Sequence, residues 1–168
     1  MDSRIDKVEN ALLEILKREI TGLDGTEKME LSVAGLNAVM RLAGEHAVTG
    51  LVANAAVRNR IVIVGRGTEG RGDVVMRLMQ QTMAHRQNLR RFEDAVGRFA
   101  RLMKEYGIAY VVFKGLAVAR HYPEPFARTR GDVDFYVPKE DFLRAVEVIE
   151  QGLHVEMYKE DVDKHYSF

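Results

Sequence analysis

Asp132 and Asp134 are the residues of this sequence whose types and spacing point most directly to chemistry. They are separated by Val133 and followed by the aromatic residues Phe135 and Tyr136. In an extended strand alternate side chains share a face, so both carboxylates would point the same way. Two adjacent carboxylates repel each other unless a cation lies between them. Mg²⁺ typically takes one or two carboxylates together with water and substrate phosphates. We therefore expect Mg²⁺ (or Mn²⁺) at this pair, in a site for nucleotide chemistry.

A phosphate-binding turn is predicted at Lys114 and Gly115, between an apolar strand and a short helix. Glycine at such a turn lets a phosphate approach the backbone, and the start of a helix favours an anion. Lys114 would add a point charge for the phosphate. The alternative interpretation is a solvated lysine at the end of a strand, with no part in binding.

Taken in order, the segments that carry these residues resemble a known motif. They are Phe113-Lys114-Gly115, Tyr122-Pro123-Glu124-Pro125, Arg128 and Gly131-Asp132-Val133-Asp134. Over about residues 107 to 168 the chain is similar to an uncharacterised nucleotidyltransferase family, in the superfamily that also contains DNA polymerase β and the aminoglycoside nucleotidyltransferases. The resemblance implies Mg²⁺- or Mn²⁺-dependent transfer of a nucleoside monophosphate from an NTP to an unknown acceptor, with release of pyrophosphate.

The resemblance also implies a role for each residue that matches the motif. Asp132 and Asp134 would be the catalytic residues and the metal ligands. The nucleotide would be bound by Lys114, Gly115, Arg128 and Gly131. The guanidinium of Arg128 is suited to bidentate contact with phosphate, although an ordinary surface arginine is the alternative. Tyr122 and the two prolines after it are interpreted as loop architecture rather than chemistry.

A third carboxylate completes the metal site in this superfamily, and it is carried by a later strand. Glu156, in Leu153-His154-Val155-Glu156-Met157, is the candidate for that position. The end of the chain resembles the middle of the family's domain, so we expect an incomplete core in which the third ligand is absent unless Glu156 supplies it. The alternative function is therefore an inactive or truncated transferase-like protein that acts as a binding or assembly module.

A second glycine motif, Gly65-Arg66-Gly67-Thr68-Glu69-Gly70, has the spacing of a dinucleotide-binding fingerprint. That fingerprint requires a strand, a tight turn, a helix and then another strand with an acidic residue about 20 positions on. A long helical pattern follows here instead. We interpret the segment as a loop and keep dinucleotide binding as the weaker alternative.

The composition limits the classes of partner. Acidic and basic residues number 25 each, so there is no net field to attract nucleic acid or an anionic membrane. Arginines on the outer faces of the long helix leave nucleic acid as an alternative to a solvated face. The absence of cysteine rules out disulfides and thiolate metal sites. With no apolar run that spans a bilayer, we expect a soluble, cytoplasmic protein.

The sequence predicts an α+β fold: a helical region over residues 1 to 106, then a partial nucleotidyltransferase-like core over 107 to 168 with a mixed sheet and flanking helices. Helices are expected over residues 4 to 20, 31 to 43, 47 to 57, 73 to 106, and from Pro138 to Gly152. Strands are expected over residues 108 to 113, 133 to 137 and 153 to 158.

The long helix is predicted to begin at an N-cap, Asp73, and to end before Gly107. Its apolar residues recur at steps of three and four from Val75 to Tyr106, which indicates one buried face. We expect this face to pack against the other N-terminal helices or against a second copy of the chain, as a homo-oligomer.

Overall fold

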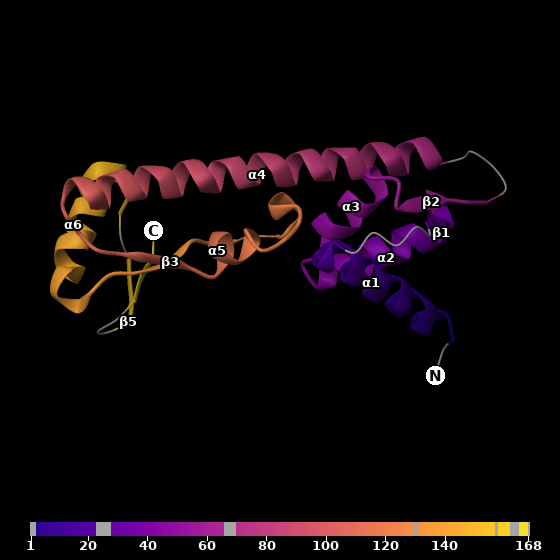
Figure 1. Ribbon diagram of the computed structural model, residues 1–168, viewed down its shortest axis with the longest axis horizontal. Helices are drawn as coiled ribbons and strands as arrows, with labels where there is room; N and C mark the ends of the chain where they lie inside the picture. Colours follow the sequence, from indigo (N-terminus) through magenta and orange to yellow (C-terminus); the bar gives the residue numbers. More distant parts are fainter. Residues whose placement is uncertain are drawn as a thin grey trace. The chain divides into compact units, whose positions relative to one another are not determined.

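The computed structural model describes residues 3–22, 28–65, 70–129, 131–156, 158–161 and 165–167 (Figure 1). The helices are α1 (Ser3–Thr21), α2 (Val33–Glu45), α3 (Thr49–Val57), α4 (Arg71–Glu105), α5 (Gly115–Ala119) and α6 (Phe142–Leu153). The strands are β1 (Met29–Leu31), β2 (Ile61–Ile63), β3 (Val111–Phe113), β4 (Asp134–Tyr136), β5 (Tyr158–Asp161) and β6 (His165–Ser167). Short 3-10 helices cover Pro125–Ala127 (η1) and Lys139–Asp141 (η2).

The strands pair two by two. β1 and β2 are parallel, whereas β3 with β4 and β5 with β6 are antiparallel. Helices dominate the rest of the described chain, so the predicted α+β class with a helical N-terminal region is confirmed. In the described part of the chain no helix is long and apolar enough to cross a membrane.

The chain packs into two compact units. The first unit comprises Met1–Arg90 and Val118–Gly131, and the second comprises Arg91–Ala117 and Asp132–Phe168. The sequence places a single boundary after residue 106. The packing differs because the segment from Val118 to Gly131 associates with the N-terminal helices.

The core of the first unit is formed by apolar faces of α1, α2 and α3. On α2, Leu36, Val39 and Ala43 are almost inaccessible to solvent, at the steps of three and four that place side chains on one face. Ser32 caps this helix, since its Oγ accepts a hydrogen bond from the backbone N–H of Gly35 at 3.0 Å.

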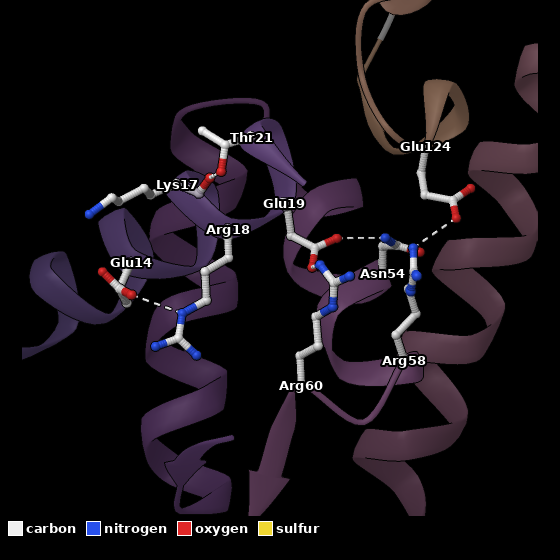
Figure 2. A network of polar contacts seen from close by, with 9 residues as sticks. All are labelled: Glu14, Lys17, Arg18, Glu19, Thr21, Asn54, Arg58, Arg60 and Glu124. Atoms are coloured by element: carbon white, nitrogen blue, oxygen red, sulfur yellow. Dashed lines mark hydrogen bonds and ion pairs between the residues drawn. The ribbon is translucent and has the colours of Figure 1, made fainter. Parts of the chain in front are cut away.

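The buried face of α1 carries a charge. Glu19 follows the apolar residues Leu12 and Ile15 on that face and is 4 % exposed. Its carboxylate accepts hydrogen bonds from Asn54 Nδ2 at 2.6 Å and from Arg60 Nη1 at 2.7 Å (Figure 2). A buried carboxylate is tolerated when both oxygens have partners, so this network joins α1 to α3 and to the start of β2.

The second unit has its own core. Its buried apolar residues come from α4, from the β3 and β4 region and from α6; they are Phe99, Met103, Ile108, Val137, Ala145, Val148 and Ile149. The ring of Phe99 lies edge-on to Tyr110, with centroids 5.0 Å apart. The same ring lies 4.4 Å from the ring of Phe135.

The long helix differs in two details from the prediction. It begins at Arg71, so Asp73 lies in the first turn and is not the N-cap. Its buried face begins at Val74, which is 3 % exposed, whereas Val75 is 36 % exposed and Tyr106 is 44 % exposed. The predicted spacing of the middle of the helix is confirmed, because Leu78, Thr82, Phe99 and Met103 are all buried. Gly107, at φ +64°, follows its end as predicted.

The region after α6 was predicted wrongly. Gly152 does not end α6, which continues to Leu153 and is capped by His154 in the left-handed conformation at φ 55°. The predicted strand over residues 153 to 158 is therefore not formed, and β5 begins only at Tyr158. A non-glycine residue at the left-handed C-terminal position gave no sequence signal for the end of the helix.

Among the residues that the structure describes, no dinucleotide-binding unit is built around Gly65. In the described sheets β2 pairs with β1 alone, and the next strand, β3, pairs with β4. The 35-residue α4 separates β2 from β3. Residues 66–69 of the glycine motif lie outside the described residues.

Candidate functional site

The antiparallel pairing of β3 with β4 brings the two halves of the motif together. In its antiparallel register Val111 lies opposite Tyr136, Val112 opposite Phe135 and Phe113 opposite Asp134. The residues that follow β3 therefore lie beside the residues that begin β4. Lys114 and Gly115 are thus adjacent to Asp132 and Asp134, although the chain between them is long.

The alternation of side chains in β4 directs Asp134 away from the core. Phe135 packs against Phe99 in the core of the second unit, so its neighbours in the strand project from the other face. The open face carries exposed apolar side chains as well, with Val111 60 %, Phe113 40 % and Tyr136 59 % exposed. Asp132 precedes the strand and is exposed. The predicted common face of Asp132 and Asp134 stays a prediction, because Asp132 lies outside the strand.

Lys114 occupies a tight turn between β3 and α5. Its backbone is left-handed, at φ 53°, a conformation that residues with a Cβ adopt at a cost of about 1–2 kcal/mol. Its Nζ lies 3.3 Å from Oδ1 of Asp134 and 5.4 Å from the ring centroid of Phe113. The Lys114 side chain is 68 % exposed and that of Asp134 is 18 % exposed. The ammonium group therefore lies against one carboxylate while remaining largely in solvent.

Gly115 is required at the next position by the backbone of the first aspartate. A Cβ at Gly115 would lie 2.9 Å from the carbonyl oxygen of Asp132, closer than real Cβ atoms approach backbone oxygen. From the sequence, a glycine is expected here because it lets a phosphate approach the backbone. The structure adds a second reason, since any side chain would displace the segment that carries Asp132.

The structure gives the surroundings of the other site candidates separately. Arg128 and Gly131 belong to the first unit, where Arg128 Nη1 donates to the carbonyl oxygen of Thr129 at 3.4 Å. Glu156 is exposed and lies between α6 and β5, outside any strand. Their proposed roles in nucleotide and metal binding stay predictions.

The donor set suits a hard cation that arrives with its substrate. Across the residues that the structure describes, no three acidic or histidine side chains gather into a metal cluster, so Glu156 does not join Asp132 and Asp134. Two carboxylates nevertheless match the one or two that Mg²⁺ takes when substrate phosphates complete its shell. The residues fit a metal held jointly with a nucleotide.

The ion pair between Lys114 and Asp134 was missed by sequence reasoning. Lys114 is considered there as a phosphate ligand or as a solvated lysine at the end of a strand, and not as a partner of Asp134. The pairing depends on the register of β3 against β4, and the apolar pattern of two three-residue strands does not determine a register. The signal was the position of the lysine directly after one strand and of the aspartate at the start of the other.

A family model described as uncharacterised nucleotidyltransferase matches residues 33–167. The chain belongs to this nucleotidyltransferase family. The match begins at the start of α2, so it covers α2, α3 and the segment that contains the aspartates, but not α1. Searches of curated proteins and of solved structures gave no match.

Proposed function

We propose that this protein transfers a nucleoside monophosphate from an NTP to an acceptor hydroxyl in a reaction that depends on Mg²⁺ or Mn²⁺. The observation that carries the proposal is the convergence of four residues at one end of the antiparallel β3–β4 pair. They are Lys114, Gly115, Asp132 and Asp134. Membership of a nucleotidyltransferase family supports the reaction class.

These four residues have distinct tasks in this proposal. Asp132 and Asp134 hold the cation, which when bound stabilises the charge that develops on the phosphate oxygens. Lys114 donates to a non-bridging phosphate oxygen as a point charge. Gly115 keeps the Asp132 backbone close to the turn, which fixes the distance between the carboxylates and the lysine.

The bond changes follow from the substrates. The acceptor oxygen attacks the α-phosphorus, and the bond from this phosphorus to the oxygen that bridges it to the β-phosphate breaks. Pyrophosphate leaves with the electron pair of that bond, and the acceptor proton passes to water. Positioning of the two oxygens in line is the main contribution that the protein makes.

Calorimetric titration with MnCl₂ tests the metal site. The wild-type protein is compared with the Asp132→Asn, Asp134→Asn double variant and with a control, Asp94→Asn, which removes an exposed acid from α4. We expect binding heat from the wild type and the control and none from the double variant. Equal heats from all three proteins would contradict the proposal.

Pyrophosphate release from each NTP tests the reaction and the third ligand. Loss of turnover in the double variant is expected if the aspartates are catalytic. Turnover in Glu156→Gln equal to wild type would show that the site is complete without Glu156. Metal binding without turnover under all acceptor conditions would favour the alternative, a transferase-like binding module.

A further inference from the structure

The open face of the β3–β4 pair carries large apolar side chains beside charged ones. In the antiparallel register Val111 lies opposite Tyr136, and Phe113 lies opposite Asp134. Because alternate side chains of a strand share a face, these four side chains project on one side of the pair, and Phe135 projects on the other. All of them belong to the second unit. Two aromatic rings, a valine and a carboxylate therefore share one surface.

The apolar part of this surface is open to solvent. Val111 and Tyr136 are each more than half exposed, and Phe113 is 40 % exposed. The two rings are diagonal neighbours across the pair, at roughly 7–8 Å, a separation that aromatic side chains can span. Adjoining exposed apolar side chains rimmed by polar groups mark a surface that binds a ligand or a partner.

The charged end of the same face indicates which ligand fits. Nζ of Lys114 lies 3.3 Å from Oδ1 of Asp134 and 5.4 Å from the ring centroid of Phe113, so the ammonium group lies on the open face. Tyr136 is two residues further along β4 than Asp134, which is about 6–7 Å in a strand. One ribose, which separates the α-phosphate of a nucleotide from its base, spans a similar length. A matching ligand has an anionic group at the lysine and a flat ring at the tyrosine.

We propose that Tyr136 and Phe113 form a platform on which the base of the bound nucleotide stacks. This inference rests on the proposed function, and it adds a base-binding surface to the residues that hold the phosphates and the metal. Stacking on an aromatic ring tolerates any base, because every base has a π-face. We therefore expect ATP, GTP, CTP and UTP all to bind, and the platform to contribute to the affinity for each of them.

The experiment measures two dissociation constants by calorimetric titration in the presence of Mn²⁺. One probe is an ATP analogue with a methylene group between the α- and β-phosphorus atoms, and the other is inorganic triphosphate, which has no base. In Tyr136→Ala we expect the dissociation constant of the analogue to rise by roughly tenfold, within the range for stacking of a base on an aromatic side chain. The dissociation constant of inorganic triphosphate should not change. Tyr136→Phe should bind both probes as the wild type does, since it keeps the ring.

Two further variants complete the design. Tyr106→Ala removes another exposed tyrosine of the second unit, after the end of α4, and should bind both probes with wild-type affinity. Tyr136→Trp keeps an aromatic ring and introduces a single fluorescent reporter, because the sequence contains no tryptophan. The ATP analogue should quench its emission, whereas inorganic triphosphate should not. This quenching decides the case if Tyr136→Ala does not fold.

Wild-type affinity of folded Tyr136→Ala for the ATP analogue would overturn the inference. So would an equal loss of affinity for inorganic triphosphate, or equal quenching of Tyr136→Trp by the two probes. A changed elution volume of Tyr136→Ala in size-exclusion chromatography, with unchanged affinity for the analogue, would overturn it in favour of a contact between protein chains. Failure of the proposed function is seen separately, as equal binding of both probes by wild type and the Asp132→Asn, Asp134→Asn variant, and it removes the inference with it.

Discussion

Nζ of Lys114 lies 3.3 Å from Oδ1 of Asp134, so the lysine that follows β3 and the aspartate that begins β4 form an ion pair at one end of the antiparallel β3–β4 pair. A cation at this carboxylate offsets the repulsion between Asp132 and Asp134 before any metal binds. The same ammonium group is the proposed phosphate ligand. In the proposed function, metal and lysine would therefore compete for Asp134, and a bound triphosphate would relieve this competition by pairing with the lysine.

Replacement of Lys114 by methionine tests this competition. Without nucleotide, we expect Lys114→Met to bind Mn²⁺ about threefold more tightly, since a solvent-exposed ion pair contributes up to about 1 kcal/mol. Affinity for an NTP in the presence of Mn²⁺ should fall, because the phosphate loses its charged donor. Electron paramagnetic resonance and calorimetric titration measure the two affinities. Lys104→Met, which removes an exposed lysine from the last turn of α4, is the control. Changes of both affinities in the same direction would contradict the competition.

Replacement of Gly115 by alanine tests the contact with the Asp132 backbone. The new methyl group would stand 2.9 Å from the Asp132 carbonyl oxygen, so the segment must shift. We expect a loss of roughly 1–3 kcal/mol in the free energy of unfolding, as for other overpacked sites. Denaturation in urea measures it.

Gly97→Ala is the matched control for that variant. A Cβ at Gly97, in the interior of α4, would meet only the end of the Arg101 side chain at 3.8 Å. Alanine should therefore stabilise the helix by roughly 0.5–1 kcal/mol. If both alanines stabilise the protein, the Gly115 turn is more open than the structure indicates.

Phe99 packs against Phe135 of β4, the strand that begins with Asp134. It is 5 % exposed and contacts the rings of Tyr110 and Phe135. We expect Phe99→Ala to lower the free energy of unfolding by roughly 3–5 kcal/mol. Phe92→Ala, at a half-buried position of the same helix, should have a smaller effect. Urea denaturation of both variants measures the difference, and an equal loss at the two positions would mean that the face of α4 is assigned wrongly.

Replacement of His154 by glycine tests how α6 ends, because the two interpretations of this region predict opposite changes in the melting temperature. Its φ of 55° is left-handed, where glycine avoids a penalty of about 1–2 kcal/mol. The greater freedom of glycine in the unfolded chain offsets roughly 0.5–1 kcal/mol of that gain. We therefore expect His154→Gly to raise the melting temperature. In a strand over residues 153 to 158 the same substitution would lower it, so a fall would favour the original sequence interpretation.

The sequence predicted most of the helices because their signals are local. Apolar steps of three and four recur within α1, α2 and α4, and glycines end α1 and α4. The buried face of α4 was nevertheless assigned from Val75 in place of Val74. Both residues are valine, and periodicity alone cannot distinguish which of two adjacent apolar residues faces the core.

The end of α6 could not be read from the sequence for a related reason. Gly152 carries the usual signal for the end of a helix, yet it lies within α6, where a Cβ would overlap the side chain of Leu102. The glycine is there for close packing against α4. The helix ends two residues later, at His154, whose backbone is in the left-handed conformation.

By itself the sequence singled out the residues that are proposed to do chemistry, which are two carboxylates one residue apart and a lysine and a glycine after an apolar strand, and it determined the family to which the chain belongs. The tertiary structure alone decided how these residues are held. The Lys114–Asp134 pair joins positions 20 residues apart. The close approach of Gly50, on α3, to the carbonyl oxygen of Ala127 joins positions that are further apart in the sequence. Residue type and local spacing determine chemical capacity and helix formation. Contacts between distant segments depend on strand register and on the close approach of backbones, and those arise only when the whole chain has packed.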